Sequence, residues 1–170
     1  MQERKGVITF LGNPMTLLGP EIKVGDKAPN FKVLDNGLKE VTLDNYKGKT
    51  LILSVAPSLD TGVCSAQTHR FNEEAAKLPA GVEILTISVD LPFAQKRFCG
   101  AENIKIGTFS DHREMSFGDA YGTHIKELRL EARSLFVVGK DGKIKLVEYV
   151  KEVTTHPDYD KALAAAKADA

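Results

Sequence analysis

The pattern of apolar and polar residues predicts a chain in which strands and helices alternate. Residues 50–56 (TLILSVA) and 82–90 (VEILTISVD) are short, nearly continuous apolar runs, typical of central strands that are covered on both faces. Between them, residues 62–78 follow a helical period that ends before Pro79 and Gly81. The apolar face of this predicted helix consists of Cys64, Phe71, Ala75 and Leu78.

Three further segments are predicted to form β-hairpins, because each has two short strand-like stretches around turn-forming residues. Asn-Gly and Asp-Gly pairs suit two-residue turns that need a positive φ. The turns are expected at Asn13-Pro14 within residues 6–19, at Asn36-Gly37 within residues 31–43, and at Asp141-Gly142 within residues 133–150.

The remaining periodic segments complete an α/β order. Residues 91–100 predict a short helix that stops at Gly100, residues 104–111 a strand, and residues 116–122 a second short helix. An alanine-rich helix closes the chain over residues 156–170. The order strand–helix–strand, followed later by strand–strand–helix, is typical of a thioredoxin-like core.

Length and composition narrow the class of protein. The 170 residues suit one α/β domain over residues 1–170, with a central mixed sheet flanked by helices and an added N-terminal β-hairpin. Lys and Arg total 23, as do Asp and Glu, so charge gives no reason to expect nucleic acid or a membrane as partner. No apolar run resembles a signal peptide or a membrane span, and two cysteines are too few for a disulfide scaffold. We expect a cytoplasmic protein without a bound cofactor or metal.

The stretch PSLDTGVC, residues 57–64, places a thiol where the first helix begins. The free amide donors and the positive end of a helix favour the thiolate, as would a nearby guanidinium. Asp60 and Thr61 are candidate helix caps, and Gly62 lets the backbone approach a small ligand. The segment therefore predicts a small anion-binding pocket in which Cys64 attacks a polar substrate.

A second interpretation of Cys64 involves no chemistry. Free cysteine is among the most frequently buried residue types, and Cys64 shares the apolar helical face with Phe71. Periodicity alone favours this inert core cysteine. The Pro-x-x-x-Thr-x-x-Cys spacing favours a reactive one, because a core thiol does not need that turn. The residues by themselves leave both interpretations open.

Four separated blocks carry a resemblance to a known family: PSLDTGVC, SVDLPFAQKRFCGAE, ARSLFVV and EVTTHPDYDKAL, in this order. The first block resembles the active-site motif of the peroxiredoxins. Together the four resemble the bacterial thiol peroxidases, atypical two-cysteine peroxiredoxins of the thioredoxin-like superfamily, along nearly the whole chain. The resemblance implies a thioredoxin-like fold and a thiol-dependent peroxidase that reduces hydrogen peroxide and organic hydroperoxides.

The resemblance also implies a role for each matching residue. Cys64 matches the cysteine that attacks the peroxide and becomes a sulfenic acid, and Thr61 matches the threonine that hydrogen-bonds the thiolate and the peroxide. Pro57 matches the proline that shields the site. Arg133 matches the arginine that stabilises the thiolate and polarises the peroxide. Cys99 matches the resolving cysteine, whose intramolecular disulfide with the first cysteine is then reduced by thioredoxin. The family also typically forms homodimers.

Other interpretations compete with these roles. A thiol redox sensor could use Cys64 and Cys99 as a switch that binds a client protein, and a thioredoxin-like binding module would have inert cysteines. Sustained peroxide consumption with thioredoxin separates the peroxidase from the sensor. The ordinary structural roles of the single residues are a surface ion pair of Arg133 with Glu127 or Glu131, helix capping by Thr61, and core packing of Cys99 with Phe93 and Phe98.

The positions of the two cysteines predict a local movement. A disulfide needs Cα atoms within about 7 Å of each other. Cys64 must also face its peroxide pocket during the first step. We therefore expect residues 62–66, the short helix that carries Cys99, or both, to unwind when the disulfide forms.

Overall fold

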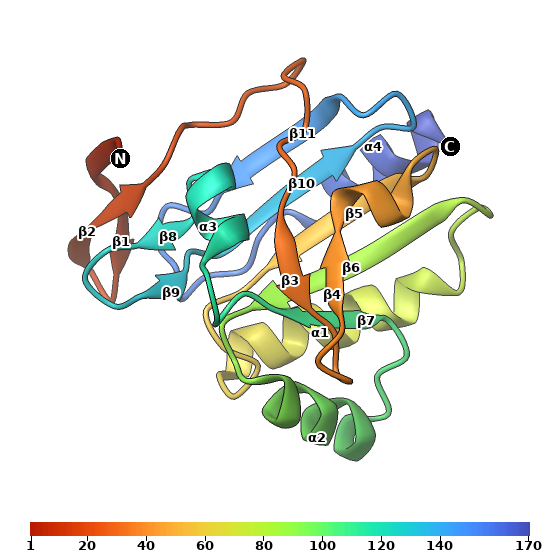
Figure 1. Ribbon diagram of the computed structural model, residues 1–170, viewed down its shortest axis with the longest axis horizontal. Helices are drawn as coiled ribbons and strands as arrows, with labels where there is room; N and C mark the ends of the chain where they lie inside the picture. Colours follow the sequence, from red (N-terminus) through yellow and green to blue (C-terminus); the bar gives the residue numbers. More distant parts are fainter.

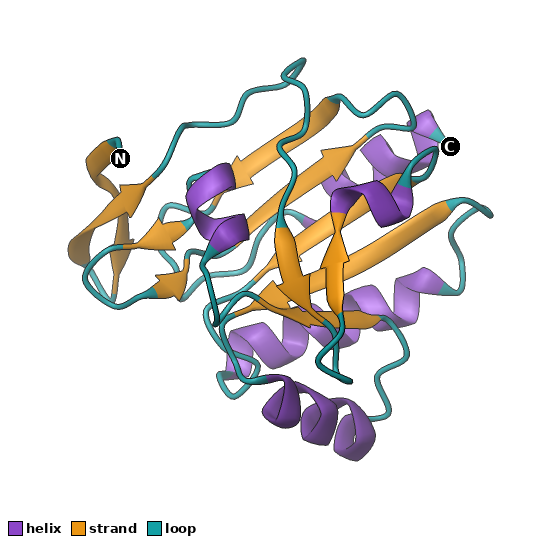
Figure 2. Cartoon of the chain, in the orientation of Figure 1, coloured by secondary structure: helices purple, strands orange, loops and turns teal.

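The computed structural model describes all 170 residues and is built around a seven-stranded mixed sheet (Figures 1 and 2). Its strands are β3 (Lys32–Leu34), β4 (Glu40–Thr42), β5 (Thr50–Val55), β6 (Val82–Ser88), β7 (Gly107–Ser110), β10 (Ser134–Val138) and β11 (Ile144–Tyr149). Their order across the sheet is β11-β10-β5-β6-β7-β3-β4. The strands β5, β6 and β7 run parallel, and every other neighbouring pair is antiparallel.

Four α-helices and one short 3-10 helix pack around this sheet. They are η1 (Leu43–Tyr46), α1 (Gly62–Ala75), α2 (Pro92–Glu102), α3 (Ser116–Tyr121) and α4 (Tyr159–Asp169). Helices α1 and α4 cover one face of the sheet, α3 lies over the other face near β3, and α2 packs beside β7 (Figure 1). None of the helices is long and apolar enough to cross a membrane. The order β5-α1-β6, followed by β10-β11-α4, confirms the expected α/β core.

The N-terminal hairpin belongs to a second, four-stranded sheet. Its strands, in the order in which they pair, are β1 (Glu3–Phe10), β2 (Asn13–Leu18), β8 (His124–Ile125) and β9 (Leu130–Glu131). The hairpin was expected and is present, but its turn lies at Leu11 and Gly12, which have positive φ angles of 51° and 80°. The predicted turn at Asn13-Pro14 is wrong, because both residues begin β2. Proline has no N–H to donate to a neighbouring strand. It is tolerated at position 14 because β8 pairs only with the other end of β2, at Leu17 and Leu18.

The second hairpin, β3–β4, also turns differently from the prediction. The residue with positive φ is Leu38, at 67°, and neither Asn36 nor Gly37 has one. The turn is closed by Asp35, whose Oδ1 accepts the N–H of Gly37 at 2.8 Å and a second N–H from Lys39 at 2.9 Å. A side-chain acceptor at the first turn position therefore replaces the expected two-residue turn. The predicted hairpin around Asp141-Gly142 is confirmed as β10–β11.

Two helix ends differ from the sequence pattern. Helix α1 stops at Ala75 rather than Leu78. Helix α2 continues through Gly100 to Glu102, and Asn103, with a φ of 55°, provides the left-handed cap. A glycine inside a helix costs stability but does not end it, whereas a residue in the left-handed conformation does.

The two faces of β5 explain why the strand has almost no polar residues. Leu51, Leu53 and Val55 belong to the core on the α3 side of the sheet, while Ile52 packs with residues of α1 and α4 on the other side. This is the period of two expected for a strand covered on both faces. The strand has two polar residues: Thr50 begins it, and Ser54 faces α1. The strand then leads at its carboxyl end directly into Pro57 and the turn before α1, where ligands usually bind in open α/β sheets.

Candidate active site

Cys64 lies in the first turn of α1, next to the carboxyl end of β5, and its side chain is fully buried. The first hydrogen bond of the helix runs from Ser65 N–H to Thr61 O, at 2.9 Å. The preceding N–H groups, including that of Cys64, therefore have no intrahelical acceptor and form the positive end of the helix. This is the environment that the sequence predicts for a reactive thiol.

Thr61 occupies the N-cap position of α1, but its side chain does not cap the helix. Its hydroxyl donates instead to the carbonyl oxygen of Ser58, at 3.1 Å. Asp60 does not cap the helix either, since its carboxylate lies 3.8 Å from Arg97 of α2. The prediction of side-chain capping is therefore wrong. The exposed Thr61 hydroxyl stays at the surface of the site, where its oxygen is free to accept a hydrogen bond from a ligand.

Arg133 is the largest fully buried side chain of the chain and stands just before β10. Its Nη2 donates to Cys64 Sγ at 3.2 Å, its Nη1 to Gln67 Oε1 at 2.8 Å, and its Nε to the carbonyl oxygen of Val153 at 2.7 Å. These three bonds fix the plane of the guanidinium against the sulfur. The structure thus brings Arg133 and Cys64 together although they are 69 positions apart in the sequence.

No carboxylate neutralises Arg133, so the surface ion pair considered from the sequence is wrong. Glu127 accepts the N–H of Thr16 instead. A buried guanidinium is costly unless an anion or full hydrogen bonding compensates for the lost water. Cys64 is the one ionisable group among its hydrogen-bond partners. The arrangement therefore places a hydrogen-bonding cation against the Cys64 sulfur, which is the setting in which reactive cysteines are found.

Glu131, the other expected partner of Arg133, belongs to a separate buried acidic pair. It accepts a hydrogen bond from the Thr123 hydroxyl and lies beside Asp111, which in turn accepts two backbone N–H groups of α3. Burial and the neighbouring Asp111 carboxyl raise the pKa of Glu131 well above its usual range. Burial and Asp111 thus favour the neutral form of Glu131, and the side chain accepts its hydrogen bond from Thr123 rather than from Arg133.

Two further polar side chains, Gln67 and Ser54, help to hold the Arg133 guanidinium in place. Gln67, on α1, donates from Nε2 to Ser54 Oγ of β5 at 2.7 Å, which leaves its Oε1 pointing at Arg133. Both side chains are fully buried. Neither residue belongs to a recognisable motif, but each carries a signal in the sequence: Gln67 is a polar residue on the buried face of the Cys64 helix, and Ser54 interrupts an apolar run.

A cavity of about 270 Å³ opens in front of Arg133. It brings together three of the predicted site residues, Pro57, Thr61 and Arg133. Cys64 is not part of the cavity wall, but its sulfur accepts a hydrogen bond from Arg133, which is. A mostly apolar wall with two threonines and one guanidinium suits a small molecule with a polar head. The lining residues are Phe10, Pro57, Thr61, Gly62, Val63, Arg133, Val153 and Thr154.

The N-terminal hairpin reaches this cavity because Glu152 holds its tip. The Glu152 carboxylate accepts hydrogen bonds from Thr9 Oγ1 at 2.9 Å, from Gly12 N at 2.8 Å and from Thr154 N at 2.8 Å. The Thr154 hydroxyl also donates to this carboxylate and has the largest effect on its pKa. Together the hydrogen bonds lower the pKa of Glu152 to about 2. The contact places Phe10 in the wall of the cavity, a role that the sequence pattern does not reveal.

Cys99 is a second free thiol, half-buried on α2. Its Sγ lies 3.4 Å from the Oγ1 of Thr108 on β7, and this hydroxyl donates to Asn36 Oδ1 at 2.9 Å. The Cys64 sulfur instead contacts Arg133. The two thiols therefore have separate surroundings, and one of them must move before a disulfide can form.

The packing of Cys99 is only partly as considered from the sequence. The thiol packs against a small apolar cluster of Leu59, Phe98 and Ile104. Phe93, however, is 65% exposed and is not a core neighbour. At the far end of α2, His69 of α1 lies 3.2 Å from Glu102, and both side chains are partly exposed. Near its start, α2 is attached by the buried Gln95, which donates to Ser88 Oγ and to Phe109 O. The rest of the helix is attached by a few apolar residues and by solvent-exposed polar contacts, which are inexpensive to break.

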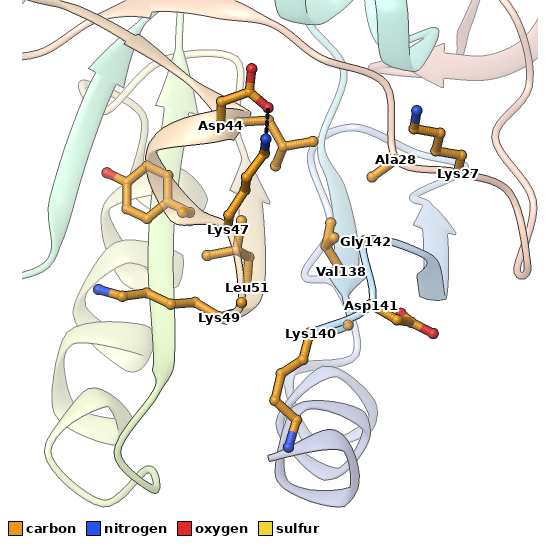
Figure 3. Close-up of a pocket in the computed structure, with 14 residues that line it drawn as sticks. Lys27, Ala28, Asp44, Lys47, Lys49, Leu51, Val138, Lys140, Asp141 and Gly142 are labelled. Carbon is orange, nitrogen blue, oxygen red and sulfur yellow. Dashed lines mark ion pairs between the residues drawn. The ribbon is translucent and has the colours of Figure 1, made fainter.

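A further cavity of about 370 Å³ lies at the opposite end of β5, beside Leu51 (Figure 3). Four lysines stand around it. Figure 3 shows that their ammonium groups point apart, with Lys47 directed at Asp44, so they do not converge on one ligand. No group of three or more His, Cys, Asp or Glu side chains in the chain could hold a metal ion. The lysines are Lys27, Lys47, Lys49 and Lys140.

Comparisons with known proteins identify the family of the chain. Residues 23–163 match the Redoxin family. The chain is 65% identical over 164 residues to a thiol peroxidase of Halalkalibacterium halodurans, which covers 95% of this chain and 97% of that protein. It is 62% identical over 162 residues to a thiol peroxidase of Bacillus subtilis, covering 95% and 96%. Among solved structures, a peroxiredoxin-like protein from Aquifex aeolicus superposes with a TM-score of 0.91 at 37% identity and full coverage of both chains. The chain therefore belongs to the thiol peroxidases of the Redoxin family.

Proposed function

We propose that this thiol peroxidase reduces hydroperoxides with Cys64 as the attacking cysteine, Cys99 as the resolving cysteine, and Thr61, Arg133 and Pro57 around the reacting atoms. One observation carries the proposal. Arg133 is buried without a carboxylate partner and donates to Cys64 Sγ at 3.2 Å. A thiolate is the nucleophile in cysteine chemistry, and a fixed cation beside the sulfur favours it.

In the first step, a hydroperoxide enters the cavity in front of Arg133. The Cys64 thiolate attacks the nearer peroxide oxygen, so that an S–O bond forms as the O–O bond breaks. The sulfur is oxidised to a sulfenic acid, and the departing alkoxide or hydroxide takes up a proton to leave as alcohol or water. Arg133 and the first-turn amides of α1 supply hydrogen bonds to the oxygens on which negative charge develops. The Thr61 hydroxyl donates to Ser58 O, so its oxygen accepts the O–H of the entering hydroperoxide.

In the second step, the thiol of Cys99 attacks the sulfenic acid of Cys64. The S–S bond forms, the S–O bond breaks and water leaves, which protects the sulfur from irreversible oxidation. This step requires Cys99 to leave its place beside Thr108, or the first turn of α1 to open, because the two sulfurs lie in separate surroundings. The exposed polar attachments of α2 support an opening of that helix.

Thioredoxin is the proposed reductant of the disulfide, in a reducing cytoplasm where both cysteines rest as thiols. The active form is proposed to be a homodimer. Leu91 and Phe93 support this, because they are 52% and 65% exposed at the start of α2 and offer an apolar surface to a second copy. Hydrogen peroxide and organic hydroperoxides are the proposed substrates, since the cavity wall combines Arg133 and Thr61 with the apolar Phe10 and Val153.

Steady-state peroxide consumption tests the proposal. Purified protein is supplied with thioredoxin, thioredoxin reductase and NADPH, and NADPH oxidation is followed after addition of hydrogen peroxide or cumene hydroperoxide. Sustained turnover that Cys64→Ser abolishes is the expected result. A single turnover that stops, with no recycling by thioredoxin, would instead indicate a redox sensor that responds once to peroxide.

A further inference from the structure

The turn in front of Cys64 is held by one side chain from another part of the chain. Asp90 stands between β6 and α2, and its Oδ1 accepts a hydrogen bond from Ser58 Oγ at 2.7 Å. Its Oδ2 accepts the backbone N–H of Leu59, also at 2.7 Å. Ser58 and Leu59 lead directly to Thr61 and Cys64. No other carboxylate in the chain accepts hydrogen bonds from this turn.

Asp90 is itself fixed by a buried polar network. Ser88 Oγ donates to Asp90 Oδ2 at 2.7 Å, and Ser110 Oγ donates to the Asp90 carbonyl oxygen at 2.5 Å. Gln95, on α2, donates from Nε2 to Ser88 Oγ at 3.0 Å. Ser88, Ser110 and Gln95 are all buried. Buried hydrogen-bond networks of this kind rigidify the groups that they connect.

These contacts form a continuous chain from the helix of Cys99 to the turn before Cys64. It runs from Gln95 to Ser88, from Ser88 to Asp90, and from Asp90 to Leu59. The other polar link between the turn and α2 is the contact of Asp60 with Arg97, at 3.8 Å between exposed side chains. A contact of that kind contributes little. Asp90 is therefore the principal polar connection between the two segments.

We propose that Asp90 is a positioning residue, which fixes the turn before Cys64 for the peroxide step and restrains the opening that the disulfide step needs. The inference rests on the proposed roles of Cys64 and Cys99. With Asp90 in place, Ser58 and Leu59 hold Thr61 at the cavity. Without it, the turn samples open conformations more often, which harms attack on the peroxide and helps the approach of Cys99.

Two substitutions separate hydrogen bonding from charge. Asp90→Ala removes all three side-chain acceptor contacts. Asp90→Asn keeps one oxygen for Leu59 N–H and Ser88, and its NH₂ group can donate to the Ser58 hydroxyl, which then turns to accept. The alanine variant should therefore lose the positioning, whereas the asparagine variant should rescue it.

The experiment measures both chemical steps on reduced protein by rapid mixing with hydrogen peroxide, acid quench and mass spectrometry. The first step is measured in a Cys99→Ser background, and disulfide formation with both cysteines present. Asp90→Ala should slow sulfenic acid formation about tenfold, while the sulfenic acid, once formed, converts to disulfide at least as fast as in the parent. Asp90→Asn should behave like the parent in both steps.

Controls keep the test specific. Asp141→Ala removes a carboxylate that accepts Lys143 N–H at 3.0 Å in the distant β10–β11 turn, and it should change neither step. Ser58→Ala removes one of the Asp90 contacts and should slow the first step less than Asp90→Ala. It also provides the test if the alanine variant of Asp90 fails to fold.

The outcomes distinguish the inference from the proposed function. If the parent protein forms no sulfenic acid at Cys64, the proposed function is wrong. If the parent reacts normally and neither Asp90→Ala nor Ser58→Ala slows the first step, the positioning role is overturned. Equal slowing of both steps by Asp90→Ala, without rescue by Asp90→Asn, would also overturn it, because a general loss of structure predicts that result.

Discussion

Replacing Arg133 with methionine should slow the peroxide reaction more than any substitution that leaves both cysteines in place. Methionine has nearly the length of the arginine stem but carries neither charge nor donors. The change removes the hydrogen bond to Cys64 Sγ and leaves Gln67 Oε1 and the Val153 carbonyl without their donors. Removal of one preorganised donor from a developing oxyanion typically costs a factor of about 100 to 1,000 in rate. We expect a slowing of that order.

The stability effect of Arg133→Met should be smaller than its kinetic effect. Each buried acceptor that loses its donor costs about 1–3 kcal/mol. The substitution also removes a buried cation, which offsets part of this cost. Arg133→Lys retains the charge but cannot make three planar hydrogen bonds, so its rate should fall between those of the parent and the methionine variant.

The assay is single-turnover peroxide loss by stopped flow, in a Cys99→Ser background that isolates the first step. Arg113→Met serves as the matched control. Arg113 is a surface arginine that contacts Glu40 at 2.7 Å and Glu114 at 3.7 Å, and such pairs contribute about 0–1 kcal/mol. An Arg133→Met rate equal to that of the Arg113→Met control would refute the role assigned to the buried guanidinium.

Three further predictions concern the acidic pair, the hairpin and the helix of Cys99. The pKa of Glu131 is raised above its ordinary value of 4.5 in the folded chain. The stability that protonated Glu131 contributes is therefore complete below about pH 4.5 and falls as pH rises toward the raised pKa, by up to about 1.4 kcal/mol per pH unit. Urea unfolding across that range should show a flatter pH dependence for Glu131→Gln, and an identical slope would contradict the raised pKa. Glu152→Ala removes the carboxylate that holds the tip of the N-terminal hairpin, which carries Phe10. Amide hydrogen exchange at Gly12 should therefore become faster, and the reaction with bulky hydroperoxides slower. Unchanged exchange at Gly12 would exclude this anchoring role. The disulfide form should exchange faster than the reduced form around residues 62–66 or in α2, while β5 and β6 stay protected, and equal protection in both forms would indicate a preformed thiol pair.

The arrangement of helices and strands could be predicted because the strong patterns lie in its centre. The run TLILSVA and residues 84–88 of VEILTISVD are buried in the structure, and the helical period of residues 62–78 corresponds to α1. The errors lie at turns and helix ends. Leu11 and Leu38 adopt positive φ although leucine rarely does, because the surrounding hydrogen bonds fix the turns. Strands as short as β8 and β9 carry too little pattern to be recognised.

The residues of the candidate site were also predictable only in part. Cys64, Thr61 and Pro57 share one short motif, so sequence alone places them together. Arg133 could be connected to them only through the family resemblance, because the contact joins residues that are far apart in the chain.

Asp90 and Glu152 could not be identified, since each acts through a tertiary hydrogen bond. A polar residue in an apolar strand or on a buried helix face, such as Ser54 or Gln67, is the local sign of such contacts.

Trapping of the sulfenic acid tests the central claim, the division of roles between the two cysteines, most directly. Reduced Cys64→Ser and Cys99→Ser variants are each mixed with one equivalent of hydrogen peroxide in the presence of dimedone, and the labelled peptide is identified by mass spectrometry. The account predicts a dimedone adduct on Cys64 in the Cys99→Ser variant, no rapid adduct on Cys99 in the Cys64→Ser variant, and an intrachain Cys64–Cys99 disulfide in the parent. A rapid adduct on Cys99 when Cys64 is absent, or a parent protein whose disulfide joins two chains, would contradict it.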